Sequence, residues 1–402
     1  MSHFLKPSHD YPYKLNDSSS GIRKILHNKK FKLITFIIAV FYILSSLIAH
    51  HRNFSLKELN AKSIKAKTEL EKHTNFKKIG SNLIGIHKLP PDTTLREKLT
   101  FHFPYEPEKS IPKKIWQTWK VEEDDETFPK NFRAFVNSWK TKNPTFNLMV
   151  IPDSLCDELI KHLYETVPEV LKAYQLMPKK ILKADFFRYL ILYARGGTYS
   201  DIDTVSLKPV STWLTFNETI EGVTNNPGLV VGIEADPDRP DWAEWYARRI
   251  QFCQWTIQAK AGHPMLRELI LKITEITHSK LERGMLNKIE GKDAGGDIMN
   301  WTGPGIFTDT VFEYLNNIYS NGIATVEPQI DWKYFTGMKI PKIVDDVLVF
   351  PITCFSPGVG QMGSKSISDE LAYVRHMFEG SWKPEDERNI GKKKTKKEKK
   401  KN

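Results

Sequence analysis

Beyond residue 110, apolar residues in this 402-residue chain follow two alternating patterns. Spacings of three and four residues, typical of helices that bury one face, alternate with short apolar runs that are typical of strands. Such alternation predicts an α/β fold in which helices connect the strands of a sheet. The clearest strand-like runs are residues 111–119 and 228–234, and the clearest helical patterns are residues 153–164, 181–195 and 309–319.

A different pattern occupies residues 33–49, where LITFIIAVFYILSSLIA contains no charged residue. These 17 residues are at the short end of the length that crosses a bilayer as a transmembrane helix. A long polar segment precedes them, which favours a membrane anchor over a cleaved signal peptide, and a buried core helix is the alternative. Because basic residues crowd the N-terminal side, the positive-inside rule predicts a cytosolic tail at residues 1–32 and a lumenal remainder.

Net charge is unevenly distributed along the chain. Residues 1–32 and 50–107 carry +5 each, and residues 392–401 carry +7. The remaining body, residues 108–391, carries −6 although the whole chain carries +11. An acidic body with basic tails argues against nucleic acid as a partner. The predicted organisation is a lumenal stem at residues 50–107, a folded domain at residues 108–384 and a basic tail at residues 385–402.

Two further features agree with a lumenal location. Asn53 and Asn217 each begin an Asn-x-Ser/Thr triplet, the acceptor sequence for N-glycosylation. The three cysteines, Cys156, Cys253 and Cys354, allow at most one internal disulfide, which leaves one thiol free or paired with another chain.

The most informative motif is the pair Asp201 and Asp203, which follows two glycines at the end of the predicted helix 181–195. We predict that residues 198–203 are extended, and residues two apart in an extended chain point to the same side. Two carboxylates on one side require a cation. Hard oxygen ligands suit Mg²⁺ or Mn²⁺, which usually keep open positions for substrate phosphates. The motif therefore predicts a metal site that binds a diphosphate.

Two other interpretations of the motif remain open. Acidic pairs are common in surface turns, and a bare D-x-D match is weak evidence for metal. The string DIDTV at residues 201–205 also fits the D-x-D-x-T/V motif of phosphatases, in which Asp201 would accept a phosphoryl group. Such a motif normally follows a run of strand hydrophobics, whereas GGTYS precedes it in this chain.

Several blocks resemble the fungal initiation-specific α-1,6-mannosyltransferases of glycosyltransferase family 32. These blocks are IPKKIWQTWK, ILKADFFRYLILYARGGTYSDIDT, WLTFNETI, GIEADPDRPDWAEWYARRIQFCQW, WTGPGIFTDT and HMFEGSW. The resemblance spans about residues 100–383 and implies a GT-A glycosyltransferase fold, a Rossmann-like nucleotide-binding sheet with an acceptor-binding half. Residues 108–384 would then be the catalytic domain of a single-pass type II protein of the early (cis) Golgi membrane.

The resemblance also implies an activity. It is the transfer of mannose from GDP-mannose, in α-1,6 linkage and with retention of configuration, onto the high-mannose core of an N-glycan, which initiates the outer chain. A family 32 enzyme that acts later on the same chain, or a subunit that works with other Golgi mannosyltransferases in a mannan polymerase complex, is the alternative. No residue is assigned as a nucleophile, and a front-face route is the usual inference for such folds.

Site residues can be carried over from the resemblance. Asp201 and Asp203 would hold Mn²⁺, with Mg²⁺ possible, and the donor diphosphate. His376 would be the third metal ligand, and the Trp382 indole N–H would contact phosphate. For His376 the simpler alternative is a histidine with an ordinary structural role.

Four more residues are implied to contact the donor. Asp185 and Arg188, one helical turn apart, would grip the sugar hydroxyls, and the alternative is a structural i, i+3 ion pair. Trp119 would stack on the nucleobase, with Gln117 contacting the nucleotide. Trp116 and Trp119 are three residues apart, so we expect one of the two to be a core residue.

Two segments are less sharply interpreted. Residues 234–255 are dense in acids, arginines and tryptophans, which suits an acceptor groove, and a long amphipathic helix is the alternative. Asp236 and Asp238 would cap that helix. Residues 300–304 form either a loop that shapes the donor pocket or the start of the next helix.

Overall fold

The computed structural model describes residues 89–237, 239–289, 297–320 and 330–380, and all statements about structure refer to these residues. The predicted anchor at residues 33–49, Asn53, Trp382 and the basic tail lie outside them. Among the helices of the described part, none is both long and apolar enough to cross a membrane.

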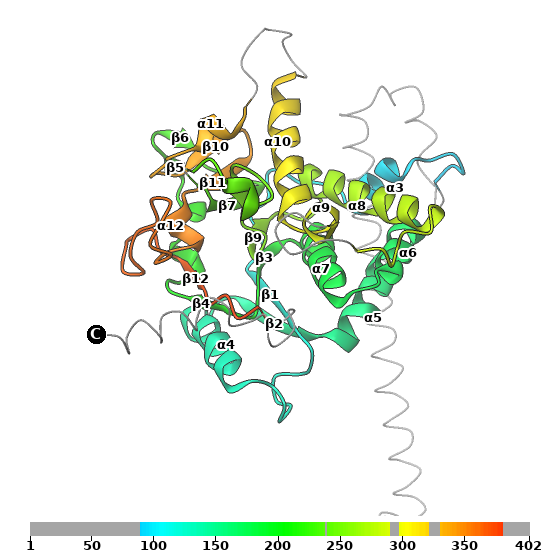
Figure 1. The fold of residues 1–402 in the computed structure, drawn as a ribbon, viewed down its shortest axis with the longest axis horizontal. Coiled ribbons are helices and arrows are strands. Elements are labelled where there is room, and N and C mark those ends of the chain that lie inside the picture. The colour runs from blue at the N-terminus through cyan, green and yellow to red at the C-terminus, as the bar shows by residue number, and fades with distance from the viewer. Residues whose placement is uncertain (1–88, 238, 290–296, 321–329, 381–402) are drawn as a thin grey trace, which may run out of the picture. The chain divides into compact units, whose positions relative to one another are not determined.

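A mixed β-sheet forms the centre of the described structure, in the order β10-β11-β7-β9-β3-β1-β2, with β8 paired to β7 (Figure 1). β1, β2 and β3 are parallel to one another, β9 is antiparallel to β3 and β7, and β11 is parallel to β7. β3, β1, β7 and β11 therefore all run in the same direction. The strands are β1 (Lys114–Trp119), β2 (Asn147–Pro152), β3 (Gly197–Ser200), β7 (Leu229–Ala235), β8 (Gln251–Phe252), β9 (Thr256–Ala259), β10 (Lys342–Val344) and β11 (Val347–Phe350).

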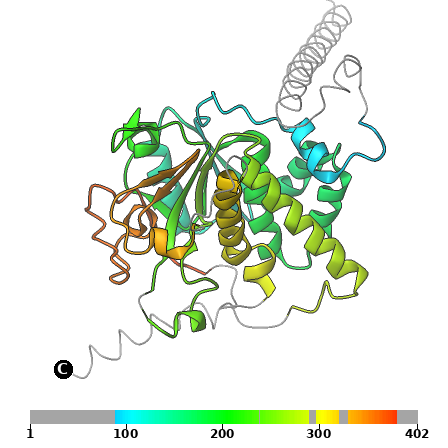
Figure 2. The ribbon, with the colours of Figure 1, turned by 90° about the horizontal axis from the view of Figure 1, so that it is seen from above.

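Helices cover both faces of this sheet. The largest apolar cluster packs α5 to α8 and α10 against one face, and a second cluster brings α12 and the chain before β12 to the other. Figure 2 shows the green and yellow helices on one side of the sheet and the orange C-terminal segment on the other. The predicted α/β class is confirmed. The helices are α3 (Leu95–His102), α4 (Lys130–Lys142), α5 (Asp153–Tyr164), α6 (Pro168–Leu176), α7 (Lys180–Arg195), α8 (Pro264–Glu282), α9 (Asp297–Trp301), α10 (Pro304–Ser320), α11 (Trp332–Phe335) and α12 (Ile352–Phe355).

Two small antiparallel ladders lie outside the main sheet. β4 (Thr204–Ser206) pairs with β12 (Val374–His376), and β5 (Thr219–Ile220) pairs with β6 (Val223–Thr224). The β4–β12 ladder joins the chain just after the D-x-D motif to a segment about 170 residues later.

The predicted helix at residues 181–195 is confirmed, and it is almost completely buried. It ends because Gly196 adopts a φ of 62°, a conformation that residues with a side chain rarely adopt. A side chain at Gly197 would also come within 2.7 Å of the Lys114 carbonyl oxygen. The glycine pair thus allows the chain to turn from α7 directly into β3, which places the D-x-D motif at the end of a central strand.

The folded part begins earlier than the boundary predicted at residue 108. α3 has an N-terminal capping box at Thr94 and Glu97, and it buries Leu99 in the largest apolar cluster. Arg96 also forms an ion pair with Glu268 of α8, with 2.7 Å between Nη2 and Oε2. The last part of the predicted stem therefore packs on the folded domain, because α3 buries Leu99 and pairs with α8 through Arg96.

Residues 234–255 do not form the long amphipathic helix that was one interpretation. β7 continues to Ala235, a short 3-10 helix covers Trp242–Glu244, and β8 begins at Gln251. Asp236 does not cap a helix within its own segment; it accepts hydrogen bonds from Arg249 and from the backbone N–H of Gly337. Asp238 lies outside the described residues.

The structure shows the surroundings of the predicted glycosylation acceptor Asn217 and of the three cysteines. Asn217 is exposed, two residues before the start of β5. Cys156, Cys253 and Cys354 are buried, and none forms a disulfide within the described part of the chain.

Candidate metal centre

The D-x-D motif lies in a tight turn after β3. The strand ends at Ser200, and the turn is closed by hydrogen bonds from the Thr204 N–H and hydroxyl to the carbonyl oxygen of Asp201, at 3.2 and 2.6 Å. The prediction that residues 198–203 are extended throughout is therefore wrong for the last three. The two carboxylates still approach a common point, because the turn and not strand alternation brings them together.

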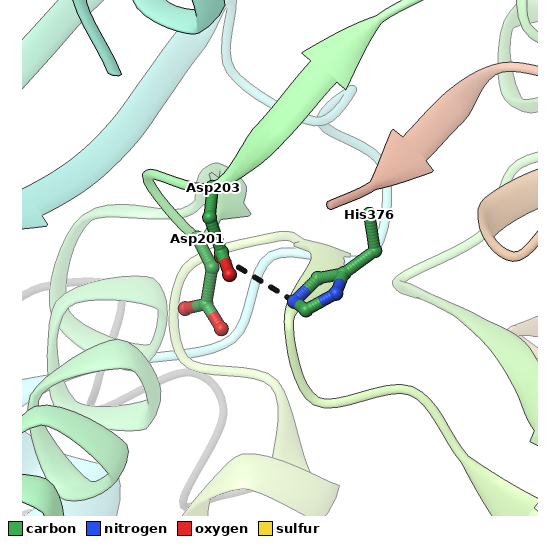
Figure 3. Close-up of side chains that lie close together, drawn as sticks. All are labelled: Asp201, Asp203 and His376. Carbon is green, nitrogen blue, oxygen red and sulfur yellow. Dashed lines mark ion pairs between the residues drawn. The ribbon is translucent and has the colours of Figure 1, made fainter. Parts of the chain in front are cut away.

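His376 reaches the same point from β12. The β4–β12 ladder pairs His376 with Thr204, and the Met377 N–H then donates to the Asp203 carbonyl oxygen at 2.8 Å. The imidazole Nε2 lies 3.4 Å from Asp203 Oδ1 (Figure 3). The Glu379 N–H donates to Asp203 Oδ2 at 3.1 Å. The chain after β12 thus wraps around Asp203 and holds its carboxylate in place.

The donor set of this cluster fits a divalent cation. Ligand atoms from Asp201, Asp203 and His376 all lie within 4.8 Å of one another. Burial raises the pKa of both aspartates; for Asp201 the Arg188 guanidinium opposes this effect and the Asp203 carboxylate adds to it. Burial lowers the pKa of His376 to about 4, so the imidazole is neutral at pH 7. Two carboxylates and one imidazole suit Mn²⁺.

Arg188 of α7 links the cluster to a second carboxylate. Its Nη2 lies 3.1 Å from Asp201 Oδ1, and its Nη1 lies 3.1 Å from Asp185 Oδ1. Tyr199 supports the same aspartate, since its hydroxyl donates to Asp201 Oδ1 at 2.8 Å. Asp185 and Arg188 are only 1% and 3% exposed. The structure places this pair next to Asp201 and shows the i, i+3 ion pair that was the alternative interpretation, and the contact with sugar hydroxyls stays a prediction.

This buried pair is not saturated by hydrogen bonds. Arg188 Nε and Nη1 have no hydrogen-bond partner of good geometry among the described residues, although Nη1 is at ion-pair distance from Asp185. Burial raises the pKa of Asp185 to about 7, against the opposing effect of Arg188. Buried donors without partners are rare in folded proteins. The pair therefore has capacity to bind a polar ligand.

Sequence reasoning missed two residues that hold Asp185. The Gln254 side-chain amide donates to Asp185 Oδ1 at 3.4 Å, and the Thr302 hydroxyl donates to Asp185 Oδ2 at 3.1 Å. Tyr189 connects the two, with its hydroxyl 2.7 Å from Gln254 Oε1 and 3.0 Å from the Thr302 carbonyl oxygen. Both residues lay inside segments that the sequence had marked, but no local pattern distinguished them from their neighbours.

The helix-start interpretation of residues 300–304 is confirmed, and a role of this segment in a donor pocket stays a prediction. α10 begins at Pro304, as the helix-start interpretation requires. The short link before it places Thr302, which is fully buried, against Asp185. The segment is thus a helix start that also contacts Asp185.

A cavity of about 470 Å³ opens beside the cluster at the end of β1. Trp119 lies in its wall, with its ring centroid 4.5 Å from that of Phe132. Trp116 is the core member of the tryptophan pair, as one of the two was expected to be, and its indole N–H donates to the Gly196 carbonyl oxygen at 2.8 Å. The lining residues are Trp119, Lys120, Val121, Thr127, Pro129, Asn131, Phe132 and Glu379.

Gln117 is fully buried and has a clear structural contact. Its side-chain amide donates to the Asp201 carbonyl oxygen at 3.3 Å, so it braces the D-x-D turn. Its Oε1 has no partner among the described residues. A direct contact between Gln117 and a nucleotide stays a prediction, as do the contacts of Trp382, which is not among those residues.

Comparison with known proteins identifies the class first. Residues 129–220 match the family model described as "Glycosyltransferase sugar-binding region containing DXD motif", a range that contains Asp185, Arg188 and the D-x-D turn. The chain is thus a glycosyltransferase that carries the D-x-D motif.

The particular family follows from longer matches. The chain is 56% identical to the initiation-specific alpha-1,6-mannosyltransferase of Candida albicans, over 87% of this chain and 92% of that protein. It is 40% identical to the protein of the same name in Saccharomyces cerevisiae, over 74% of this chain and 83% of that protein. The chain belongs to the family of initiation-specific α-1,6-mannosyltransferases, so the phosphatase interpretation is wrong.

Among solved structures, the PaToxG glycosyltransferase shares 18% identity and covers 65% of this chain and 83% of its own, with a TM-score of 0.34. A likeness of this size does not assign a fold.

Proposed function

We propose that this chain transfers mannose from GDP-mannose, in α-1,6 linkage, onto the high-mannose core of N-glycans and so initiates the outer chain. The observation that carries the proposal is the cluster of Asp201, Asp203 and His376 beside a buried Asp185–Arg188 pair. It stands in a chain that is 56% identical to an initiation-specific enzyme over most of its length. We also propose the GT-A arrangement and retention of configuration for this fold.

The metal and the diphosphate belong at the D-x-D turn. Asp201, Asp203 and His376 would hold Mn²⁺, which when bound supplies positive charge to the diphosphate as the sugar leaves. The N–H groups of Met377 and Glu379 keep Asp203 oriented. A carboxylate that is already fixed needs no reorganisation when the donor binds, which favours the transition state.

The sugar and the nucleoside belong on either side of this turn. Arg188 and Asp185, with unsatisfied donors and a buried carboxylate, are suited to the hydroxyl groups of a hexose. The cavity beside Trp119 is suited to a nucleoside, because the aromatic wall offers a surface for the base. In this proposal Trp119 contacts the guanine, and Gln117 acts mainly through the Asp201 backbone.

The cellular setting is part of the same proposal. Residues 33–49 would anchor the chain as a single-pass type II protein of the early Golgi membrane, with the folded part in the lumen. The exposed Asn217 is compatible with a lumenal environment, in which its triplet would be accessible for modification.

The test is a transfer assay with the full-length, detergent-solubilised chain. GDP-mannose, Mn²⁺ and a defined high-mannose oligosaccharide are supplied, and the new linkage is located by mass spectrometry and linkage-specific glycosidase digestion. We expect one added α-1,6-mannose on the unextended core oligosaccharide.

The acceptor preference separates the alternatives. Activity only on oligosaccharides that already carry an α-1,6-mannose would instead identify an enzyme that acts later on the same chain. Binding of GDP-mannose and Mn²⁺ without transfer to either acceptor would identify a non-catalytic subunit. Absence of donor binding, measured by calorimetry, would reject the proposal.

A further inference from the structure

The order of the strands shows which elements lie on either side of the metal cluster. β1, β3 and β9 are neighbours in the sheet, and the D-x-D turn follows the middle one. The cavity beside Trp119 lies at the end of β1. Trp255 directly precedes β9, which runs antiparallel to β3, so it lies at the same edge of the sheet but on the other side of the turn. Trp255 and the end of β1 therefore lie on opposite sides of the turn, and Glu379, next to Phe378, reaches the wall of the cavity that we assign to the nucleoside.

Trp255 also lies on the sheet face opposite α7. It belongs to the apolar cluster of the face that carries α12, whereas Asp185 and Arg188 project from α7 on the other face. The two sides of the turn thus differ in chemistry: buried charge on the α7 side and aromatic rings on the Trp255 side.

An exposed aromatic side chain completes the Trp255 side. Phe378, two residues after His376, is 51% exposed. Its ring centroid lies 4.3 Å from that of His376 and 5.8 Å from that of Trp255, and the Trp255 and His376 rings are 4.6 Å apart. Three rings are thus packed beside the metal cluster, and the outermost has a large surface open to solvent.

The backbone of Phe378 has an unfavourable conformation. Its φ is 51°, in the left-handed region that bulky residues rarely adopt. Glu221, Asp345 and Met362 share such a φ, and the first two each lie in a two-residue hairpin loop that requires it.

At Phe378 the residues on both sides are held by Asp203, because the N–H groups of Met377 and Glu379 donate to it. The Phe378 N–H itself donates to His376 Nδ1 at 3.0 Å. An exposed phenyl ring kept in a strained position beside a reactive centre indicates a function.

A second observation points to a missing polar partner. Trp255 is only 7% exposed, yet its indole N–H has no hydrogen-bond partner among the described residues. Buried tryptophan N–H groups usually find a partner. A ligand that offers both an apolar face and hydroxyl oxygens would satisfy the phenyl ring and the indole together, and pyranose rings have this combination.

We propose that Phe378, supported by Trp255, is the stacking surface for a mannose ring of the acceptor oligosaccharide. The inference rests on the proposed function and deepens it by assigning the acceptor to the Trp255 side of the D-x-D turn. The donor sugar occupies the α7 side, next to Arg188, so the two sugars meet at the metal cluster.

The test compares acceptor and donor kinetics in full-length Phe378 variants. Phe378→Ala and Phe378→Leu remove the aromatic face, and Phe378→Leu keeps apolar bulk. We expect both to raise the KM for the oligosaccharide about tenfold, the effect of losing one ring-stacking contact. Phe378→Trp and Phe378→Tyr keep an aromatic face and should remain within about twofold of the unmodified chain. Ile367→Ala, at another exposed apolar residue of the C-terminal segment, is the matched control and should change neither constant.

Donor measurements distinguish failure of this inference from failure of the proposed function. The KM for GDP-mannose and the rise in melting temperature caused by Mn²⁺ with GDP should be unchanged in Phe378→Ala. An unchanged acceptor KM in that variant overturns the inference. So does a parallel loss of Mn²⁺ and GDP binding, which would show that Phe378 only positions the segment around Asp203. If the unmodified chain transfers no mannose at all while donor binding persists, the proposed function fails instead.

Discussion

The two ends of the parallel strands form opposite edges of the central sheet, and each edge carries partly buried aspartates in different surroundings. At the edge where β11 begins, Asp346 accepts hydrogen bonds from Tyr105 at 2.6 Å and from Tyr314 and His263 at 3.1 Å. Burial acts against its charged form, but His263 and these hydrogen bonds lower the pKa of Asp346 to about 2. At the other edge, where β3 ends, burial dominates and the pKa values of Asp201 and Asp203 are raised.

The two edges differ in how completely the surrounding protein satisfies the carboxylates. The Asp346 network is closed: its partners come from the chain before β1 and from α8 and α10, and it fits so tightly that a side chain at Gly228 would lie 2.0 Å from the Tyr105 hydroxyl oxygen. The D-x-D edge is open, with donors on Arg188 and Trp255 that lack partners among the described residues. The protein thus favours the charged form of Asp346, whereas burial of Asp201 and Asp203 outweighs the contacts that favour their charged forms.

The largest expected effect is the loss of activity in Asp203→Asn. The amide cannot supply the negative charge that a divalent cation requires, so we expect transfer to fall by about a thousandfold or more. Because the folded protein raises the pKa of Asp203 above its unfolded value, the ionised group destabilises the metal-free fold. The melting temperature without metal should therefore be unchanged or higher, and the rise caused by Mn²⁺ with GDP should disappear. Full activity would contradict the metal assignment.

Arg188→Lys should have the next largest effect. A guanidinium spans Asp185 and Asp201 with two separate nitrogens, and a single ammonium cannot do so. We expect kcat/KM to fall about a hundredfold, as an order of magnitude for a misplaced charge at a reacting centre, with a lower melting temperature. Arg195→Lys, at the end of the same helix, is the control and should behave as the unmodified chain does. Equal activity of the two variants would make the Asp185–Arg188 pair purely structural.

Asp346→Asn should lower stability and leave activity unchanged, the opposite of the result expected for Asp203→Asn. The pKa of Asp346 is lowered from 3.8 to about 2, which corresponds to about 2 kcal/mol of stability. That contribution is fully present above pH 3.8 and is lost as the pH falls through about 2. We expect a lower unfolding free energy in urea at pH 7, a difference that shrinks at acidic pH, and unchanged transfer at temperatures where the variant is folded. Lost activity in a fully folded variant would break the distinction between the two edges.

Thr302→Val should have the smallest effect on activity, and it tests whether Thr302 positions Asp185 at the D-x-D edge of the sheet. It removes one hydrogen bond to Asp185, worth about 0.5–1.5 kcal/mol, so kcat/KM should fall about threefold to tenfold. Thr302→Ser keeps the hydroxyl and should restore most of the activity. If both variants match the unmodified chain, Thr302 packs beside the site without positioning Asp185.

Local sequence signals predicted the elements that carry the site. The periodicity of residues 181–195 gave α7 to within one residue, and the helix at residues 153–164 was found with its observed ends. The D-x-D pair was identified from its local setting, whereas the roles of Asp185, Arg188 and His376 were implied by the family resemblance, and the structure brings these residues together. These features are visible because helix spacing, glycine pairs and acidic motifs depend on neighbours in the chain.

Other features could not be found in this way. The early start of the fold at α3, the irregular path of residues 234–255 and the contacts of Gln254 and Thr302 with Asp185 all depend on partners 70 to 170 residues away. Even the convergence of Asp201 and Asp203 was predicted for the wrong reason, since a turn produces it and not strand alternation.

The sequence alone therefore determined which side chains are candidates to hold a metal, a diphosphate and a sugar, and on which elements they lie. Only the tertiary structure decided which carboxylates are satisfied and which are open, and where Phe378 stands relative to Trp255. The physical reason is that ionisation and burial depend on the full surroundings of a group in space, and those surroundings come from strands and helices that are distant along the chain.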